Sequence, residues 1–431
     1  MKVAEAFAAF MRGRLPWLPS LLGRLPDHRR PDMCRYSAAH LCWQALLMFL
    51  CRSGSRNAFD QSRNSGALPA ALGAACGSDA GAVTCGDNAA RFLKRLAPEH
   101  LELVLLAVVA RLFESRAFDG SRVPGGLYAV VLDGTVREKC RKGFEGGGKA
   151  SGKARYRYVL QASVLLRGRA VPVMHEHVDV EDPVSEKEDC EINAAKRLLP
   201  RLKAAFPHMP FVILGDALYA CRPVAAECRR HGWRFCLTFK EGRTPEVWRE
   251  AVRLMGLEPG NRLSHRDRPA SDPASRHSAL RWIGDIDFSE KGGGPLAVTA
   301  VEEIETVAGE QTLYAWITDV PGLGAGNILG LIHATGRERH TIEDQFNVQK
   351  NNGFGLEHVF CADATAGKNY YALMQLAYLL WTLFYHGLLT RLHAWAGKTA
   401  QATLARLLLD GLRATGAADP GWRACQLRFV T

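Results

Sequence analysis

Apolar residues recur at intervals of three and four through most of residues 36–117, the spacing of one face of an α-helix. The segments SAAHLCWQALLMFLCR and PEHLELVLLAVVARLFESR show this spacing most clearly, and no strong strand pattern interrupts them. A shorter helix is predicted in GDNAARFLKRLAPEH, with Asp87 or Asn88 as its N-cap. The outward side of this helix is basic: Arg91, Lys94 and Arg95. The pattern therefore predicts an all-helical N-terminal domain over residues 1–120.

Short continuous apolar runs replace the helical pattern after a Pro-Gly-Gly break, as is typical of central strands covered on both faces. One run, LYAVVLDGT, stops at Asp133, and another, MPFVILGDALY, ends at Asp216. Three more strands are predicted in RYRYVLQASVLLR, AVPVMHEHVDV and WRFCLTFK. Helices are predicted in SEKEDCEINAAKRLLPRLKAAF and RPVAAECRRHG. We therefore expect the first part of an α/β core over residues 121–239.

The next segment, residues 240–316, mixes Pro-, Ser- and Arg-rich loops with pieces that resemble strands, such as LRWIGDIDF and LAVTAVEEIETV. The simplest prediction is a β-rich insertion. The helical pattern resumes near residue 327. We assign residues 317–390 to the second part of the core and residues 391–431 to a helical C-terminal region.

The most apolar segment, residues 370–389, approaches the length of a membrane span. Gln375, Thr382 and His386 interrupt it, so we interpret it as a buried core helix and expect no membrane partner. The segment TLARLLLDGL, nearer the C-terminus, is expected either to pair subunits or to pack on its own domain.

The composition favours a polyanionic partner, because the sequence has 55 Lys and Arg residues but only 44 Asp and Glu residues, which gives a formal net charge of +11. Nucleic acid is the first expectation, ahead of a membrane surface. The twelve cysteines include no C-x-x-C pair, which argues against a zinc site and indicates single thiols in a reducing cytosol. The first residues, MKVAEAFAAFMRGR, are interrupted by Glu5 and do not resemble a signal peptide. We therefore expect a cytoplasmic protein.

Three acidic residues stand out by their positions. Asp133 and Asp216 each end an apolar strand, and the carboxyl ends of adjacent parallel strands lie close together. Glu343 lies in RHTIEDQFNVQK, a predicted helix that is able to pack across them. Three carboxylates form a cage of hard oxygen ligands suited to Mg²⁺, and two such ions activate water and stabilise the leaving oxygen of a phosphodiester.

The predicted helix around Glu343 carries both charges on one face. Arg339, Glu343, Phe346 and Lys350 are spaced by four, three and four residues. We expect Arg339 and Lys350 to hold phosphates of the same substrate, whereas the alternative is a solvated face crossed by salt bridges. Thr341 and Asp344 suggest a helix that starts at residue 341 and leaves Arg339 just outside it.

The blocks VVLDGT, ILGDALY and RHTIEDQFNVQK resemble the three acidic blocks of the DDE transposases of bacterial insertion sequences, specifically the branch called insertion-sequence family four. That branch carries the signature Tyr, two residues, Arg, three residues, Glu, six residues, Lys. Arg339, Glu343 and Lys350 match its last three positions, whereas Gly336 stands at the tyrosine position. This departure puts in doubt a side-chain contact near the cleaved phosphate and leaves metal binding untouched. The resemblance extends more loosely over about residues 36–390.

The resemblance implies an RNase H-like catalytic core and cut-and-paste movement of an insertion sequence. Asp133, Asp216 and Glu343 would be ligands of two Mg²⁺ ions, for which Mn²⁺ can substitute, and Arg339 and Lys350 would contact DNA. Some relatives hold a flipped base against a tryptophan of the insertion, for which Trp282 is the nearest candidate and a plain core tryptophan the alternative. The partners would be double-stranded DNA and a second subunit, as a homodimer on the bacterial nucleoid.

Other motifs suggest weaker alternatives. The loop KGFEGGGKASGKARYRY approaches a P-loop twice, but each match ends in Ala where Ser or Thr is needed. It is better interpreted as a flexible basic loop whose cations touch phosphates: Lys139, Arg141, Lys142, Lys149 and Lys153. HEHVD, with His175, His177 and Asp179, imitates a metallo-hydrolase motif but lacks its following histidine. The remaining alternative is a catalytically silent DNA-binding protein of transposase descent.

Overall fold

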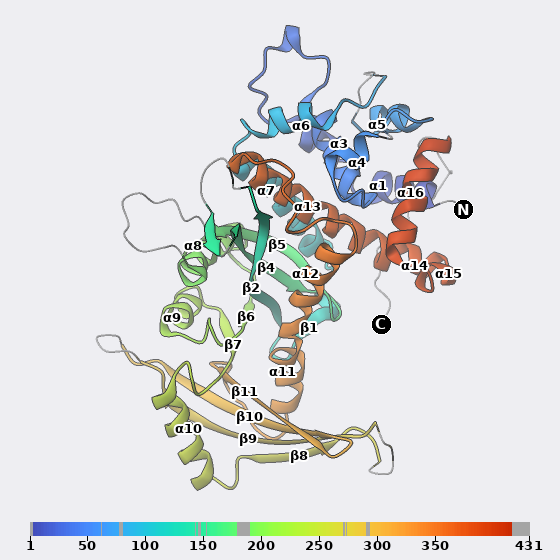
Figure 1. Ribbon diagram of the computed structural model, residues 1–431. Coiled ribbons are helices and arrows are strands. Elements are labelled where there is room, and N and C mark those ends of the chain that lie inside the picture. The colour runs from blue at the N-terminus through green and yellow to red at the C-terminus, as the bar shows by residue number, and fades with distance from the viewer. Residues whose placement is uncertain are drawn as a thin grey trace.

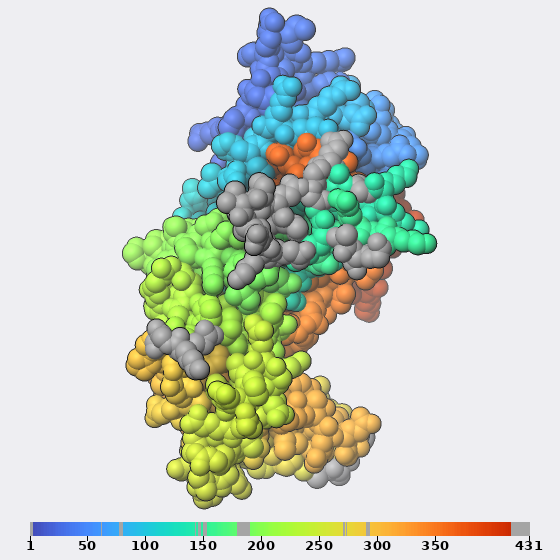
Figure 2. Space-filling view, turned by 60° about the vertical axis from the view of Figure 1, so that its left-hand side comes forward, coloured from blue at the N-terminus to red at the C-terminus, as the bar shows by residue number. Residues whose placement is uncertain are grey.

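The computed structural model describes residues 3–415 except 62, 77–80, 143, 145–147, 152, 179–189, 270–271, 273 and 290–293. These residues form an elongated α/β protein, with helices at one end and the strands of the insertion at the other (Figures 1 and 2). One mixed sheet of eleven described strands runs through it. The predicted α/β class is confirmed.

The N-terminal end is helical, as predicted. Its helices are α1 (Val3–Arg14), α2 (Leu18–Gly23), α3 (Ala38–Leu50), α4 (Arg56–Asp60), α5 (Leu68–Cys76), α6 (Gly86–Leu93) and α7 (Pro98–Glu114), with 3-10 turns at Pro31–Met33 and Asp119–Ser121. Every residue of α3 is buried, which agrees with its nearly unbroken apolar sequence. This helix and α7 both pack against α13 (Ala364–Phe384), so the helical end is joined to the core.

The predicted cap of α6 is wrong. Cys85 precedes the helix and makes no side-chain capping bond, while Asp87 lies in the first turn. The carboxylate of Asp60, from α4, instead accepts from the backbone N–H of Gly86 at 2.9 and 3.0 Å. A tertiary partner therefore satisfies a helix-end donor that we had assigned to a local side chain.

The central strands are β1 (Arg122–Val123), β2 (Leu127–Cys140), β3 (Lys149–Ser151), β4 (Ala154–Leu165), β5 (Ala170–Val178), β6 (Phe211–Gly215) and β7 (Arg234–Thr238). The order across the sheet is β5-β4-β2-β6-β7. Strands β2, β6 and β7 are parallel, and β4 is antiparallel to its neighbours β2 and β5. Helices α8 (Glu191–Ala205) and α9 (Arg222–Arg230) lie on one side of this sheet and α12 (Thr341–Asn351) on the other (Figure 1).

The segment between residues 240 and 316 contributes four antiparallel strands and one helix. These are α10 (Pro245–Leu257), β8 (Arg262–Arg266), β9 (Arg276–Asp287), β10 (Ala297–Val307) and β11 (Glu310–Thr318). Helix α10 was not predicted. Strand β11 pairs with β7, with Trp316 opposite Thr238, so the insertion continues the central sheet.

The chain then forms α11 (Ile328–Ala334), a 3-10 turn η3 (Arg337–His340), α12 and α13, a π-helical turn (Tyr385–Leu389), α14 (Thr390–Leu392), α15 (Ala394–Gly397) and α16 (Gln401–Thr415). The helical stretch Ala364–Leu392 is long and apolar enough to cross a membrane by length and composition, but 89% of its most apolar window is buried inside the protein. The predicted core helix is confirmed. Helix α16 packs against α1 and α5 of its own chain.

Candidate active site

Two aspartates meet where β2 and β6 lie side by side. Val131 of β2 pairs with Leu214 of β6 in the parallel register. Asp133 and Asp216 come two residues after these partners, so they occupy matching positions along the neighbouring chains. Strand β2 does not end at Asp133, as its sequence suggested, but continues to Cys140 in pairing with β4. Asp216 follows the last residue of β6, and its carboxylate accepts from the N–H of Leu218 at 2.8 Å. The two carboxyl groups therefore share one edge of the parallel strands.

Helix α12 brings Glu343 to this edge. The helix begins at Thr341, and Arg339 lies in the preceding 3-10 turn, as predicted. The proposed cap is wrong, because the hydroxyl of Thr341 donates to the carbonyl of Glu338. Arg339 reaches both acids, with its Nη1 3.8 Å from Oδ2 of Asp133 and its Nη2 in close contact with Oε1 of Glu343. One guanidinium thus joins the third acid to the first.

Buried amides hold the other face of α12. Gln345 and Gln349 donate to Oε1 of Gln375, on α13, at 3.1 and 2.9 Å. Ser163 of β4 donates to Gln345 at 2.8 Å. All four side chains are buried, so each hydrogen bond replaces one that water can no longer supply. This network fixes the rotation of α12 that presents Glu343 to the aspartates.

Glu191, the first residue of α8, is a fourth acid that the sequence did not reveal. Its carboxyl group lies so close to Gly134 that a Cβ there would overlap it. The hydroxyl of Tyr219 donates to Glu191 Oε2 at 2.8 Å. Burial raises the pKa of Glu191, and the charge of Asp216 raises it further. No local pattern marks this residue, since only the fold brings α8 against β2.

Negative charge is concentrated at Asp133. Burial, opposed in part by Arg339, raises the pKa of its carboxyl group to about 7. The neighbouring carboxylates add to the rise: Asp216, Glu191 and Glu343. Like charges that share a poorly solvated site disfavour full ionisation, and a bound cation would relieve this repulsion.

Carboxylate oxygens at this edge have the chemistry that Mg²⁺ prefers. In the described part of the chain, however, no three His, Cys, Asp or Glu side chains are grouped to hold a metal ion. Arg339 lies against both Asp133 and Glu343, where its positive charge does part of what a metal cation would do. The carboxylates are of the chemical type that Mg²⁺ prefers, but they are not grouped around one point, and Glu343 would have to leave Arg339 to join the two aspartates.

Lys350 lies at the far end of α12 from Arg339. The rise of α12 from Thr341 to Lys350 is about 14 Å, and Arg339 lies before that helix, so the two cations would meet different phosphates of one substrate. The amine of Lys350 is 3.0 Å from Oε1 of Glu357. The backbone of Glu357 accepts from Lys139 and donates to Arg137 of β2 at 2.9 and 3.0 Å. Lys350 is thus positioned next to the basic end of β2.

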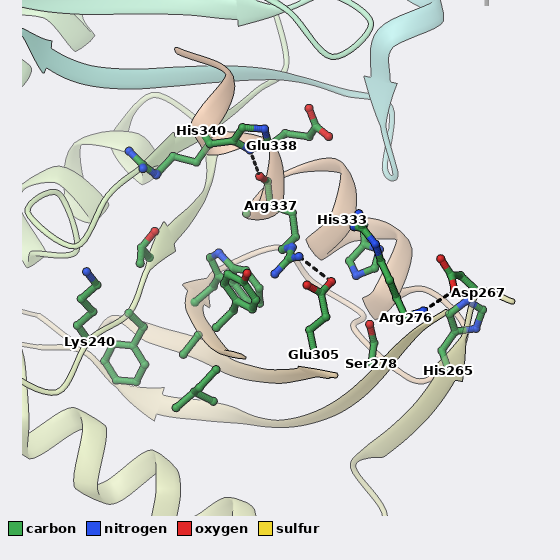
Figure 3. Close-up of a pocket in the computed structure, with 18 of the residues that line it drawn as sticks. Lys240, His265, Asp267, Arg276, Ser278, Glu305, His333, Arg337, Glu338 and His340 are labelled. Carbon is green, nitrogen blue, oxygen red and sulfur yellow. Dashed lines mark hydrogen bonds and ion pairs between the residues drawn. The ribbon is translucent and has the colours of Figure 1, made fainter. Parts of the chain in front are cut away.

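A pocket of about 1050 Å³ opens beside the carboxylates, between the insertion strands and η3 (Figure 3). Arg339, which contacts Asp133 and Glu343, belongs to its lining, whereas the carboxylates themselves do not. Glu305 accepts from Arg337 at 2.7 Å, and the guanidinium of Arg337 lies 3.7 Å above the ring of Tyr314 (Figure 3). Charged and aromatic groups therefore alternate along one wall.

Gly336, at the tyrosine position of the resembled signature, lies in this wall beneath Trp316. A Cβ at residue 336 would overlap the indole of Trp316. The backbone of Gly336 is ordinary right-handed helix, so the glycine is needed for space and not for conformation. The indole of Trp316, from the last strand of the insertion, therefore fills the space next to position 336.

Trp282, the expected partner of a flipped base, is 5% exposed and is not among the residues lining the pocket. It belongs to β9, on which α10 packs. Trp316 lines the pocket but is itself 2% exposed. A stack of either indole on a base would require the covering residues to move.

The basic residues predicted to meet DNA fall into two groups. Lys139, Arg141, Lys142 and Lys153 are exposed around the β2–β4 turn, and the charge of Lys149 acts on Glu191. Several residues of this loop lie outside the described residues. The second group is exposed on and just after α6, at the helical end: Arg91, Lys94 and Arg95. The first group lies on and after the central strand β2, and the second belongs to the helical N-terminal end.

The rival metal motif does not form a cation site. His175 and His177 share a strand face with ring centroids 5.1 Å apart, but Arg137 Nη1 lies 2.8 Å from Nδ1 of His177. Burial lowers the pKa of His175 to about 3, and nearby arginines lower it further. Asp179 lies outside the described residues. The P-loop alternative also fails, because strand β4 follows the glycine-rich segment where a helix would be required.

No protein-family model matches this chain, and no curated protein shows a significant match to it. The resemblance to DDE transposases therefore rests on the three acidic blocks and their order.

Proposed function

We propose that the chain is a DDE transposase that moves an insertion sequence by metal-dependent cleavage and strand transfer of DNA. The observation that carries this proposal is the meeting of Asp133 and Asp216 on adjacent parallel strands, with Glu343 joined to them through Arg339. Three acids far apart in sequence converge, in the order that the resembled family has them.

The strand order supports an RNase H-like core. Five strands in the order β5-β4-β2-β6-β7, with β4 antiparallel, carry the first two acids on the two central parallel strands. The third acid comes from α12, a helix that packs on β2 and β5.

In this proposal Asp133, Asp216 and Glu343 hold two Mg²⁺ ions, which would activate the attacking oxygen and stabilise the leaving one. Mn²⁺ would substitute. Arg339, released from Glu343, would neutralise the phosphate next to the cleaved bond, and Lys350 a phosphate further along. Glu191 would accept a proton or orient Asp133 from the position where Tyr219 holds it.

The DNA partner follows from charge. The exposed cations after β2 and around α6 would contact the phosphates of transposon ends and target, in the bacterial cytoplasm on the nucleoid. Because two ends must be joined, we propose a homodimer on DNA.

A second function is favoured by one observation. Arg339 is paired with two of the three acids, and a guanidinium held there would keep metal out. A DNA-binding protein of transposase descent that no longer cuts is consistent with such an arrangement.

The deciding experiment is cleavage of a supercoiled plasmid that carries the element's own ends, with purified protein and Mg²⁺ or Mn²⁺. Natural protein would be compared with Glu343→Gln and Asp133→Ala, with Asp344→Asn as the control on the same helix. End-specific cuts that vanish in the first two variants and persist in the control support the transposase. Tight end binding without cuts by the natural protein supports the silent binder.

A further inference from the structure

A second cavity, of about 310 Å³, lies outside the carboxylate cluster and the pocket of Figure 3. It is formed between the β4–β5 turn and the end of the α13 helical stretch. Its lining is strongly basic: Leu166, Arg167, Arg169, Thr382, His386, Thr390 and Arg391. None of the described residues that line it is acidic.

One wall is a strained hairpin turn. Arg167 has φ +50° and Gly168 φ +69°, and Leu166 and Arg169 close the turn through hydrogen bonds of 2.8 and 3.2 Å. A two-residue turn of this kind favours Asn-Gly, because a side chain in the left-handed region adds about 1 kcal/mol of strain. The chain nevertheless has arginine there, and Arg167 lines the cavity while its guanidinium lies near Gly120.

The opposite wall is a second backbone irregularity. The helix widens to a π-helical turn over Tyr385–Leu389, and His386 lies within it. Single π-helical turns are rare and are frequent at functional sites. Burial lowers the pKa of His386 to about 3, and Arg169 lowers it further, so the ring is neutral and retains one N–H donor. The hydroxyl of Thr390 adds a donor on the same wall, whereas that of Thr382 is hydrogen-bonded to Tyr378.

We propose that this cavity binds a phosphate group. Guanidinium forks match phosphate oxygens with paired charge-assisted hydrogen bonds, and the neutral imidazole and the Thr390 hydroxyl supply further donors without adding charge. The site would take either a backbone phosphate of DNA or free phosphate, since both present the same oxygens. The inference does not depend on the carboxylate cluster or on cleavage.

The test uses purified full-length protein and the double variant Arg169→Gln/Arg391→Gln at the exposed rim of the cavity. The matched control, Arg249→Gln/Arg253→Gln on α10, removes the same charge from an exposed surface elsewhere. Thr390→Val provides a second cavity variant that keeps the charge. Inorganic phosphate binding would be measured by calorimetry, affinity for a short labelled DNA duplex by fluorescence anisotropy, and folding by circular dichroism.

We expect the affinity of the cavity double variant for phosphate or for the duplex to be at least about tenfold lower than that of the control. Removal of one charged hydrogen bond already predicts a loss of this size. Thr390→Val should lower the affinity less. Loss of inorganic phosphate binding alone identifies free phosphate as the ligand. Loss of duplex affinity beyond that of the control identifies a DNA phosphate. If folded cavity variants match the control in both measurements, the proposal is overturned.

Discussion

The indole of Trp316 covers Gly336 so closely that no side chain can begin at position 336 without displacing it. The two residues come from different parts of the chain, the last insertion strand and the turn before α12. The glycine at position 336 is therefore required by the space that the Trp316 side chain occupies.

Gly336→Ala should destabilise the protein by about 1–3 kcal/mol, as overpacking of a well-filled site usually does. Gly330→Ala on α11 is the matched control, because the nearest atom to its added Cβ is 4.0 Å away. Urea unfolding measures both. The Gly336→Ala penalty should shrink in a Trp316→Leu background. If the two alanine variants had equal stability, the indole of Trp316 would be able to move aside at no cost in folding free energy.

Asp133→Asn should stabilise the protein at neutral pH. Burial raises the pKa of the folded carboxyl group to about 7, above the unfolded value, so the unfolded chain loses its proton first. The contribution of this carboxyl group to the free energy of unfolding therefore decreases as the pH rises from about 4 to about 7. The asparagine variant does not ionise at this position and does not show this decrease. We expect a gain of about 1–3 kcal/mol at pH 8 and little at pH 4, measured by urea unfolding. The same gain from Asp344→Asn, or a gain that is independent of pH, would contradict this account.

Gln375→Leu should destabilise the protein by about 2–4 kcal/mol, because it leaves the amide donors of Gln345 and Gln349 without their acceptor in a buried site. Met374→Leu, on the same buried helix, conserves volume and should change stability by less than about 1.5 kcal/mol. If Glu343 depends on this network, Gln375→Leu should also weaken Mn²⁺ binding measured by calorimetry. A destabilised variant with unchanged Mn²⁺ affinity would separate packing from positioning.

The triple variant Arg91→Gln/Lys94→Gln/Arg95→Gln should weaken DNA binding more at low salt than at high salt. Each phosphate contact that is lost reduces the slope of log affinity against log salt by about 0.9. We therefore expect a slope reduction of about 2–3 if all three residues touch the duplex. Fluorescence anisotropy across a salt series measures this, with three exposed cations of the insertion replaced as the control: Arg249, Arg253 and Arg262. An unchanged slope would remove this face from the DNA-binding surface.

Glu191→Gln should lower Mn²⁺ affinity by about 10–100-fold, the usual effect of losing a group that supports metal ligands. Tyr219→Phe, which removes the hydroxyl that donates to Glu191, should have a smaller effect in the same direction. Calorimetry with Mn²⁺ measures these affinities. The control is Glu99→Gln, exposed at the start of α7, which should bind Mn²⁺ as the natural protein does. Wild-type affinity in Glu191→Gln would exclude Glu191 from the site.

The sequence predicted those features that a single segment determines. Helix α3 and strand β6 were found because their apolar residues are nearly continuous, and Asp216 because it follows such a run. Features that depend on distant partners were missed. Strand β2 continues past Asp133 with polar residues because β4 pairs with it, and Asp60 replaces a local cap of α6. Glu191 and the Trp316–Gly336 contact have no local signal, since each requires elements that only the fold brings together.

The pairing of β11 with β7 also shortens the path by which the third acid reaches the first two. Asp216 and Glu343 are far apart in sequence, but the ladder between Trp316 and Thr238 brings the chain back to the core before α12 begins. The loop that must close to assemble the acids is then less than half as long, and each halving of loop length spares about 0.6 kcal/mol of conformational entropy. An insertion that forms its own hairpins first would thus act as a folded bridge, and a change in its size would have little effect on how readily the three carboxylates meet.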